Sequence, residues 1–389
     1  MFTCNNYGKI MKKKVLFITP GLYQGGLEHS LIMMLRLLDQ SKYDLYLYTY
    51  RKDLSLLPLV PQYVKVYNDL LNQHYYRKPK AILYQLLHKI THQEKYQEKL
   101  KQYIHYQKVT QPQKHYSDTC FDAVIANSIG KTSEMAAYVN AKKRYAFFHS
   151  SVDLHHDTNA KLFPKYDGII AVSQGVKDML CNSYDGIENK VYVLENYVDA
   201  SEIIEKADEP LNTSIPDKKL ILSTCGRFSE EKGFDLAVES AKELKDKGID
   251  FVWLFVGDGV LREKLEESLD KYGLQDNILI TGYVENPFPY IKCCDIYVQP
   301  SYHESYGRTI KEAIILGKPI VSTDTVGGNT LLENGMYGEI VPISAEEITN
   351  GIMSAIKKNQ QGIYRKYDIN DNQKEKETYI NGLESIIDS

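Results

Sequence analysis

Short apolar runs alternate with amphipathic segments along the first half of the chain. The run 14–20 is apolar, follows lysines and precedes Gly21 and the pair Gly25-Gly26, a pattern typical of a buried strand that enters a glycine loop. Residues 27–38 then place apolar side chains at helical spacing. Strands that alternate with helices predict a mostly parallel sheet. Its further strands are predicted at residues 45–50, 121–126, 145–149, 168–173 and 191–194.

A second series of the same kind follows a polar stretch. Residues 199–219 are rich in Glu, Asp and Pro and poor in large apolar residues, which indicates a linker. Residues 378–387 resemble a short amphipathic helix. The sequence therefore predicts an α/β protein with two doubly wound domains. The strands of the second domain are predicted at residues 220–224, 251–256, 277–281, 296–299, 319–322 and 339–341.

Length and composition agree with two folded domains. The chain has 389 residues, of which 43% are hydrophobic and 25% charged, and domains usually run to roughly 100–200 residues. A net charge of −4 argues against a nucleic-acid-binding domain, which normally has an excess of Lys and Arg. No window approaches the roughly 18 apolar residues of a membrane-spanning helix, and no signal peptide is recognised, so a cytoplasmic address is expected. Met1 and Met11 both stay open as the natural start.

Residues 75–115 interrupt the alternation with a basic segment. From Tyr76 to Lys114 there are nine Lys or Arg and two Glu, a net charge of +7. This predicts a basic amphipathic helix, whose face can meet anionic lipid headgroups or a lipid-linked acceptor at the inner face of a membrane. The alternative is a solvated basic helix packed on its own sheet. The apolar residues at roughly helical intervals are Ile82, Leu83, Leu86, Leu87, Ile90 and Tyr103.

The stretch 299–313 combines a strand, a glycine turn and a helix start. Amides near Gly307 at that helix start carry a partial positive charge and form a ready site for a diphosphate. Glu304 before the turn and Glu312 after it can accept hydrogen bonds from ligand hydroxyls on either side. From the spacing alone, a capped helix with an ordinary solvated glutamate remains the alternative.

Several blocks together resemble the retaining glycosyltransferases of family 4, in the order and spacing of that family. This resemblance implies the GT-B fold, in which two Rossmann-like domains face each other across a cleft. Residues 1–200 would be the acceptor-side domain and residues 201–369 the domain that binds the donor, with a helix at about 370–389 packing back on the first. The blocks are GRFSEEKG at 226–233, VGDG at 256–259, TGYV at 281–284, CDIYVQPS at 294–301, the stretch 304–312, and GKPIVSTD at 317–324.

The resemblance also assigns roles. Glu304 would bind donor-sugar hydroxyls, Glu312 would take the ribose hydroxyls, and Arg227 and Lys232 would clamp the diphosphate, whose charge grows as the glycosidic bond breaks. His149 would point into the cleft near the sugar, although a lone histidine at a strand end is usually structural. The residues assigned to donor binding are Gly25, Gly26, Val284, Ser305, Tyr306, Gly307, Arg308, Thr309 and Glu312.

Two features in this set need separate comment. The loop Gly25-Gly26, with Glu28 opening the helix behind it, is either the family's phosphate-facing loop or a glycine turn without a ligand. Ser305 stands where family members commonly have glycine, so the identity of the donor sugar is the least transferable property. Ser173 also matches the family.

No metal and no cofactor are expected. No two aspartates are separated by one residue, so the D-x-D metal site of the other large glycosyltransferase fold is absent. A metal site is not favoured in the cluster around His149, Asp153, His155, His156 and Asp157 either, because ligands adjacent in sequence do not converge easily.

The resemblance implies a metal-independent, retaining transfer of a hexose or N-acetylhexosamine. The donor would be a nucleotide sugar, most readily a UDP-sugar, and the acceptor a hydroxyl of a lipid-linked saccharide in bacterial surface polysaccharide or capsule synthesis. Two alternatives stay open: a non-catalytic nucleotide-sugar-binding subunit and a UDP-sugar epimerase. A dinucleotide-dependent oxidoreductase is disfavoured, because no glycine loop completes G-x-G-x-x-G.

Overall fold

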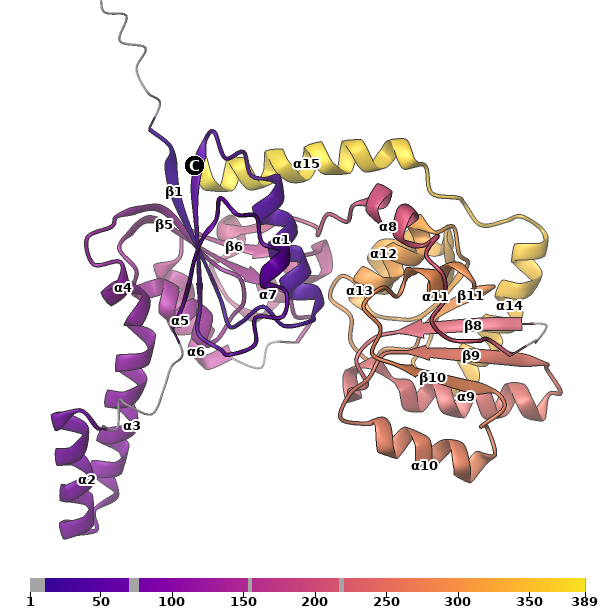
Figure 1. Cartoon of the computed structure of the whole chain (residues 1–389), viewed down its shortest axis with the longest axis horizontal. Coiled ribbons are helices and arrows are strands. Elements are labelled where there is room, and N and C mark those ends of the chain that lie inside the picture. The colour runs from indigo at the N-terminus through magenta and orange to yellow at the C-terminus, as the bar shows by residue number, and fades with distance from the viewer. Residues whose placement is uncertain (1–10, 70–76, 153–155, 217–219, 389) are drawn as a thin grey trace, which may run out of the picture.

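The computed structural model describes residues 11–69, 77–152, 156–216 and 220–388 and contains two parallel sheets, each flanked by helices (Figure 1). Within these residues, the first sheet has seven strands in the order β3-β2-β1-β4-β5-β6-β7. Its strands are β1 (Lys13–Thr19), β2 (Tyr43–Thr49), β3 (Lys65–Asn68), β4 (Phe121–Ala126), β5 (Ala141–Phe148), β6 (Gly168–Ala171) and β7 (Val191–Val193).

The second sheet has six described strands in the order β10-β9-β8-β11-β12-β13. Neighbouring strands are parallel in both sheets, so the prediction of two doubly wound α/β units is confirmed. The strands are β8 (Leu220–Cys225), β9 (Phe251–Val256), β10 (Ile278–Gly282), β11 (Ile296–Gln299), β12 (Ile320–Thr323) and β13 (Gly338–Val341).

Helices connect successive strands and cover the sheets. None of the described helices combines the length and apolar character that crossing a bilayer requires. The helices are α1 (Gly26–Leu37), α2 (Pro79–Thr91), α3 (Glu94–Val109), α4 (Gln111–His115), α5 (Lys131–Tyr138), α6 (His156–Leu162), α7 (Gln174–Ser183), α8 (Ala200–Lys206), α9 (Phe234–Asp246), α10 (Arg262–Tyr272), α11 (Phe288–Lys292), α12 (Arg308–Ile315), α13 (Val326–Leu332), α14 (Ala345–Gln360) and α15 (Ile369–Asp388).

Continuous apolar runs account for the central strands. Strand β9 has the sequence FVWLFV and is buried at every position, as expected for a parallel strand covered on both faces. The one polar atom of its Trp253 side chain is satisfied, because the indole N–H donates to Thr224 Oγ1 at 3.0 Å. Strands of this kind form the rigid support on which the loops at the sheet edge are placed.

The expected linker at residues 199–219 is wrong in its first part. Residues 200–206 form α8, because the Asp199 carboxylate accepts two backbone N–H bonds of 3.0 and 3.2 Å from the first turn and so caps the helix. Ile203 of α8 is buried against Ile315 of α12. The connection between the two sheets is therefore docked on the second domain.

The basic segment also differs from the expectation of one amphipathic helix. It forms α2 and α3, and His92 at the junction adopts a left-handed conformation with φ 53°. Tyr103 lies on α3 and packs at the small core between the two helices, so it does not share a face with Ile82. Residues 75 and 76 of the predicted segment lie outside the described residues.

Helix α15 touches both halves of the molecule, and Figure 1 shows it (yellow) running from the second sheet toward β1. At its far end Lys42 pairs with Glu384 at 2.9 Å, and Leu383 is fully buried in the core of the first domain. Near its start, Lys311 of α12 pairs with Glu375 at 2.6 Å. Apolar burial and these partly buried ion pairs together fix α15 on both domains.

We predict that Asn372→Ala destabilises the junction of α15 with the chain segment that joins the two domains. The Asn372 side chain is buried, accepts bonds from the Tyr197 hydroxyl (2.9 Å) and the Ala200 N–H (3.1 Å), and donates to the Val198 carbonyl (2.8 Å). Groups left unpaired after its removal cost roughly 1–3 kcal/mol each. Differential scanning calorimetry should show a melting temperature lower by roughly 3–8 °C.

The matched control is Asn370→Ala, because Asn370 is exposed and bonds to Asp368 on the surface. Its melting temperature should stay close to that of the wild type. Equal melting temperatures for both variants would contradict the role given to Asn372.

Candidate active site

The carboxyl edge of the second sheet brings together polar residues from separate chain segments. The strand order reverses between β8 and β11, and ligands of doubly wound proteins bind where the order reverses. The loop after β8 carries Arg227 and Lys232, and the loop after β11 carries Glu304. The structure thus places these three predicted residues at one edge.

Glu304 is buried and fixed by three donors that converge on one of its oxygens. Its Oε1 accepts an ion-paired hydrogen bond from Lys232 Nζ, a bond of 2.9 Å from Gln299 Nε2 and a bond of 3.2 Å from Ser301 Oγ. Gln299 is itself oriented, because its Oε1 accepts from the Thr309 hydroxyl at 2.9 Å. No bond to the described residues uses Oε2 of Glu304, so that oxygen can accept hydrogen bonds from a ligand.

Two basic side chains differ in how they are held. Lys232 is half-buried and committed to Glu304. Arg227 is exposed, and its guanidinium forms no hydrogen bond or ion pair with the described residues. Burial raises the pKa of Tyr23 and of Glu28 in the first domain, and the Arg227 charge opposes this rise in both. Arg227 therefore faces the first domain with its donors free for an anion.

Gly307 makes the turn that aims the start of α12 at this site. Its φ of 81° is left-handed, and a Cβ there would lie 2.8 Å from Ile310 Cδ1, so glycine is required on two grounds. The helix that follows presents the unpaired N–H groups of Arg308 and Thr309, and this end carries a partial positive charge. With Arg227 and Lys232, the site has the charge to hold a diphosphate.

Glu312 and Arg308, both predicted to bind the donor, pair with each other. Arg308 Nε donates to Glu312 Oε1 at 3.0 Å, one helical turn apart. Burial raises the pKa of Glu312, and the Arg308 charge opposes that rise. A ligand hydroxyl that binds Glu312 must therefore share the carboxylate with Arg308.

The Gly25-Gly26 loop of the first domain lies against this pair. A Cβ on Gly26 would be 4.0 Å from Arg308 Cδ. Burial, helped by the charge of Arg308, lowers the pKa of the neighbouring His29 to about 4, so this side chain is neutral near pH 7. The loop predicted to face the donor phosphates thus does face the start of α12.

Ser305 and Tyr306 sit where the two domains touch. The Ser173 hydroxyl at the start of α7 donates to the Ser305 carbonyl at 2.8 Å. Tyr306 is buried, and Gly327 packs so closely that a Cβ there would lie 2.6 Å from the Tyr306 carbonyl oxygen. Val284 follows the edge strand β10, with β9 and β8 between it and β11, and packs on the hydrophobic core.

His149 follows β5 at the carboxyl edge of the first sheet. Its ring stacks on Phe147 with centroids 5.4 Å apart, and it hydrogen-bonds the Asn127 backbone. Burial lowers the pKa of His149 to about 4, so the imidazole is neutral near pH 7. Because Nε2 is buried without a partner among the described residues, it can accept one hydrogen bond from a ligand hydroxyl.

Further polar atoms of the first domain are unpaired, and the sequence reasoning missed them. Thr19 Oγ1, both side-chain polar atoms of Asn127, and Glu28 Oε1 are buried without a hydrogen-bond partner among the described residues. Thr19 ends β1 and Asn127 follows the adjacent strand β4, with Asn127 N–H donating to the Ile18 carbonyl at 2.9 Å. The strand order of the first sheet reverses between β1 and β4.

Such atoms are rare in folded proteins, since each costs roughly 1–3 kcal/mol. Thr19, Asn127 and His149 therefore form a buried polar cluster at the carboxyl edge of the first sheet, with hydrogen-bonding capacity that the described residues do not use. The available signal was a polar residue at the end of one buried strand and another directly after a second, but only the strand order places these residues side by side.

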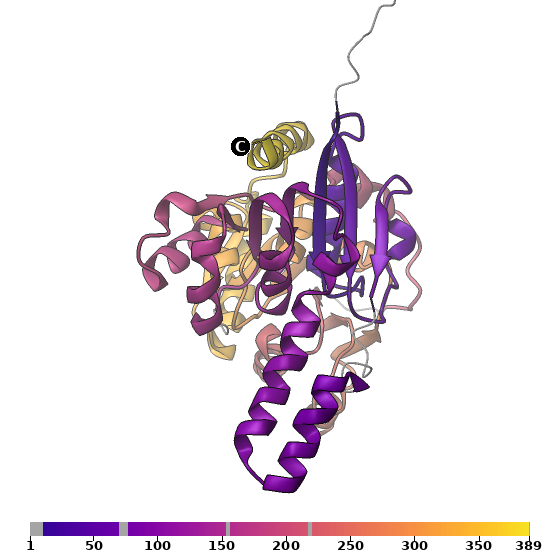
Figure 2. The same ribbon diagram turned by 90° about the vertical axis from the view of Figure 1, so that its left-hand side faces the viewer.

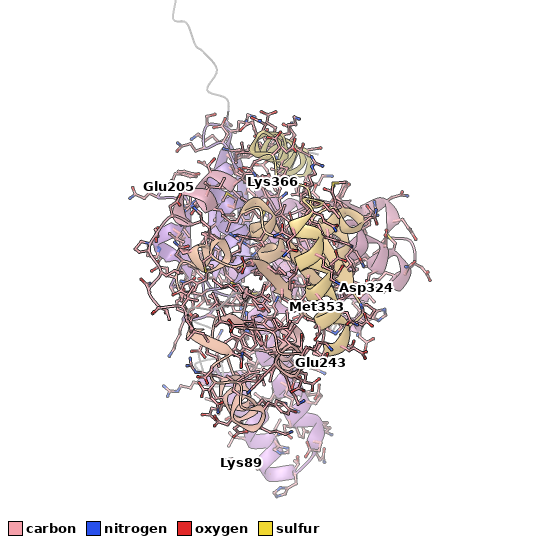
Figure 3. All side chains as sticks on the ribbon, turned by 90° about the vertical axis from the view of Figure 1, so that its right-hand side faces the viewer. Lys89, Glu205, Glu243, Asp324, Met353 and Lys366 are labelled. Atoms are coloured by element: carbon pink, nitrogen blue, oxygen red, sulfur yellow. The ribbon has the colours of Figure 1, made fainter. Side chains whose placement is uncertain are left out.

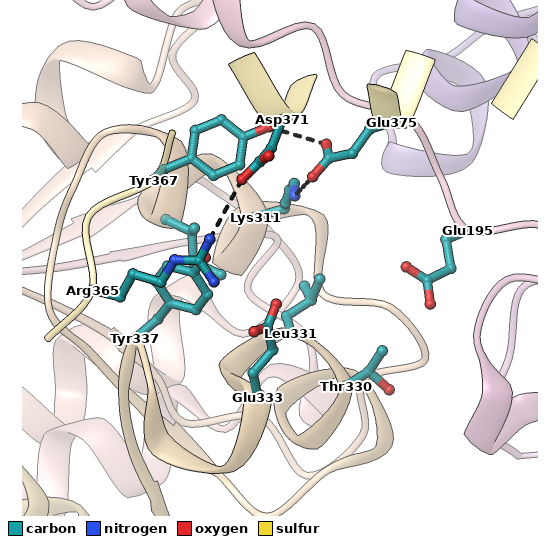
Figure 4. Close-up of a pocket in the computed structure, with 11 residues that line it drawn as sticks. Glu195, Lys311, Thr330, Leu331, Glu333, Tyr337, Arg365, Tyr367, Asp371 and Glu375 are labelled. Atoms are coloured by element: carbon teal, nitrogen blue, oxygen red, sulfur yellow. Dashed lines mark hydrogen bonds and ion pairs between the residues drawn. The ribbon is translucent and has the colours of Figure 1, made fainter. Parts of the chain in front are cut away.

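A polar pocket of about 370 Å³ behind α12 is separate from the site around Glu304. Figure 4 shows Lys311 pointing to Glu375 and Arg365 to Asp371 in this pocket, between α12 and the start of α15. Because these groups pair with each other, the pocket stabilises the docking of α15. The described residues contain no group of three metal-ligating side chains, and Asp153 and His155 of the sequence cluster lie outside the described residues.

Comparison with known proteins bears mainly on the second domain. Residues 205–375 match the family model described as Glycosyl transferases group 1. The 2-deoxystreptamine N-acetyl-D-glucosaminyltransferase of Niallia circulans is 32% identical over 167 residues, which cover 41% of this chain and 43% of that protein. The capsular polysaccharide biosynthesis glycosyltransferase CapM of Staphylococcus aureus is 26% identical over 185 residues, 44% of this chain and 47% of that protein. The chain thus spans less than half the length of these relatives.

Solved structures match the whole fold. Anabaena Alr3699/HepE, solved with UDP-glucose, shares 18% identity over 96% of this chain and 99% of that chain, with a TM-score of 0.67. The structure of TarM gives a TM-score of 0.70 at 14% identity over 98% of this chain and 100% of that chain. At these identities the likeness concerns the fold, and the GT-B architecture expected from the resemblance is confirmed.

We predict that Glu28 makes folding stability depend on pH. Burial raises the pKa of this carboxyl from its ordinary 4.5 to about 7, so between these values the folded protein binds more protons than the unfolded chain. Stability from this group is present at low pH and is lost as pH rises through 7, by up to roughly 3 kcal/mol. In Glu28→Gln that loss should vanish.

The measurement is the melting temperature of wild type and Glu28→Gln at pH 6 and pH 8, where the difference between the two proteins isolates Glu28. Glu231→Gln is the control. Partial desolvation raises the pKa of this exposed carboxyl, but the hydrogen bond from Ser229 and the charge of Lys232 outweigh it and lower the pKa, so its ionisation does not change across this range. A wild type and a Glu28→Gln variant with the same pH dependence would refute the buried, neutral carboxyl.

Proposed function

We propose, from the match of residues 205–375 to the glycosyl transferases group 1 family, that this chain transfers a hexose or N-acetylhexosamine from a nucleotide sugar to an acceptor hydroxyl. The observation that carries the proposal is Glu304, a buried carboxylate held on one oxygen by Lys232 and Gln299 beside the start of α12. Glu304 places a carboxylate oxygen, which can bind sugar hydroxyls, next to a site for phosphate. A nucleotide sugar carries both groups side by side. The solved complexes of Alr3699/HepE with UDP, glucose and UDP-glucose support a UDP-linked donor.

The diphosphate of the donor would lie at the start of α12. The N–H groups there, the free guanidinium of Arg227 and the ammonium of Lys232 are all donors. Charge-assisted bonds to phosphate are about twice as strong as neutral ones, and they strengthen as negative charge grows on the departing phosphate. These groups supply the charge in the proposed metal-independent reaction.

The sugar would lie between Glu304 and His149. Oε2 of Glu304 and the neutral Nε2 of His149 are both acceptors, which suits hydroxyl groups. Glu312 would accept a ribose hydroxyl while it keeps its bond to Arg308.

The reaction we propose retains configuration and uses no protein nucleophile. The bond from the anomeric carbon to the phosphate oxygen breaks, the acceptor oxygen bonds the same carbon on the same face, and the acceptor proton passes to the departing phosphate. Contact of the two domains at Ser173 and Ser305 keeps water from this centre.

The acceptor would bind at the cluster of unpaired polar atoms in the first domain. Thr19, Glu28 and Asn127 offer both donors and acceptors there, as a saccharide requires. One relative, from Campylobacter jejuni, is an N-acetylgalactosaminyltransferase whose name specifies a saccharide linked to diphospho-undecaprenol, at 27% identity over 186 residues. With CapM, it supports a lipid-linked saccharide acceptor in surface polysaccharide synthesis, and hence a cytoplasmic enzyme working at the inner membrane face.

Two other functions use the same nucleotide-sugar site. A non-catalytic subunit would bind the donor without turnover, and an epimerase would interconvert UDP-sugars without an acceptor. The cluster of unpaired polar atoms that includes His149 and Asn127 favours transfer, because neither alternative needs a second saccharide site. Incubation with UDP-sugars alone and with acceptor saccharides separates the three by product analysis.

We predict that Arg227→Ala abolishes the thermal stabilisation given by UDP while leaving the unliganded protein unchanged. The Arg227 guanidinium makes no hydrogen bond or ion pair with the described residues, so its loss should affect the ligand only. The measurement is the melting temperature with and without UDP at a concentration that stabilises the wild type. The control is Arg262→Ala, an arginine of the same domain that bonds to Glu266 and Asp258 on α10 and its preceding loop. Wild type that gains no stability from any UDP-sugar would refute the proposal.

A second prediction separates the two glutamates. Glu304→Ala should lower kcat for transfer by roughly 100-fold or more, because it removes support for the developing charge. Glu312→Ala should mainly raise KM for the donor, since ribose binding is the same before and during reaction. Steady-state kinetics against a panel of UDP-sugars measures both. Full activity in both variants would contradict the assignment.

A further inference from the structure

A helical hairpin projects from the first domain. Figure 2 shows α2 and α3 side by side, extending away from the sheets, and Figure 1 shows the same projection from another side. The hairpin has a small core of its own, in which Ala81 and Ile104 are buried and Leu100 and Tyr103 pack against them. Because α3 covers only one face of α2, no other described element covers the opposite face of α2.

That outer face of α2 is apolar. Ile82, Leu83, Leu86 and Ile90 are 43%, 52%, 51% and 74% exposed, and their spacing of one, four and eight residues puts them on one side of the helix. In contrast, Ala81 is the one residue of α2 that is buried. Contiguous exposed apolar side chains on a monomer mark a surface that binds something.

Positive charge borders the apolar row. Lys80 and Lys89 lie on the two sides of the row, about 100° and 280° around the helix from Pro79 when the row centres near 0°. The Lys80 ammonium lies over the rings of Tyr84 and Tyr103, 6.0 and 5.5 Å from their centroids. Lys89 lies near the outer end of the hairpin in Figure 3. In the part of the chain that the structure describes, neither lysine pairs with a carboxylate. Residues 77–114 contain nine Lys or Arg against two Glu.

We infer that the outer face of α2 docks on the surface of an anionic lipid bilayer. The helix would lie in the headgroup plane with the row at Ile82, Leu83, Leu86 and Ile90 in the acyl boundary and the lysines at the phosphates. Helices with this division of faces bind such interfaces, and each Lys near an anionic surface strengthens binding by about fivefold.

Charge decides against a second copy of this chain as the occupant. Two hairpins, each with six Lys against two Glu in residues 79–109 and hence a net charge of +4, would repel each other when their α2 faces met. An anionic bilayer is complementary to both the charge and the apolar row. The role of this docking rests on the proposed function, because it would bring the site to lipid-linked acceptors, but the docking itself does not depend on catalysis.

The test is flotation of the full-length protein with vesicles of phosphatidylcholine, alone or with phosphatidylglycerol. Wild type should float with the anionic vesicles, bind the neutral vesicles at least tenfold less, and be released by high salt. Leu86→Ser with Ile90→Ser, and separately Lys80→Gln with Lys89→Gln, should each lower the partition coefficient roughly tenfold or more.

Val260→Ser is the matched control, because Val260 is 90% exposed on the second domain, and it should float as the wild type does. All variants should keep the wild-type melting temperature and its shift with UDP. Equal binding to both vesicle types, undiminished binding of the Leu86/Ile90 variant, or concentration-dependent self-association without flotation would overturn the docking. If docking fails but UDP still shifts the melting temperature, the proposed function stands. If the protein floats with anionic vesicles but UDP gives no shift, only the proposed function is refuted.

Discussion

The site depends on one buried ion pair, between Lys232 and Glu304. A charged pair removed from water costs several kcal/mol unless further hydrogen bonds satisfy it, and here Gln299 and Ser301 supply them. All three donors fall on Oε1 of Glu304. The pair therefore fixes the carboxylate in one rotamer and also joins the loop after β8 to the loop after β11, which are otherwise separate in sequence.

Helix α12 connects this ion pair to the rest of the molecule. Its first turn faces the ion pair through Thr309, its buried face packs in the core through Ile310, and Lys311 on another side bonds to α15. Helix α15 in turn is buried on the first domain. Displacement of α15 therefore moves the same helix whose start holds the anion site, and binding at the site and the relative position of the two domains are physically linked.

Sequence was most informative where local rules decide the structure. Strands β4, β9 and β11 have the predicted bounds, because long apolar runs have few alternatives to burial. Strand β3 was missed, since its four residues KVYN lie partly exposed at an edge. The pair Arg308 and Glu312 was readable in principle from its spacing of four, yet both were assigned to the ligand alone.

Long-range neighbours were beyond such rules. No residue close to Lys232 in the sequence indicates that its partner is Glu304, 72 residues away. Thr19 and Asn127 become neighbours only because β1 and β4 are adjacent in the sheet. Asp199 could have been recognised as a helix cap, but the short α8 behind it holds too few apolar residues to show a period. The unpaired atoms near His149 are a property of packing, which sequence patterns do not report.

The route of α15 has a consequence for how the chain is made. Leu383, Ile386 and Ile387 belong to the same hydrophobic core as the strands of the first sheet. During synthesis, which proceeds at roughly 5–20 residues per second, the surface they cover stays bare while the whole second domain is translated, a delay of roughly ten seconds or more. The first domain is thus the earlier half to emerge from the ribosome and the last to be completed, and in that interval its uncovered apolar surface is a target for chaperones.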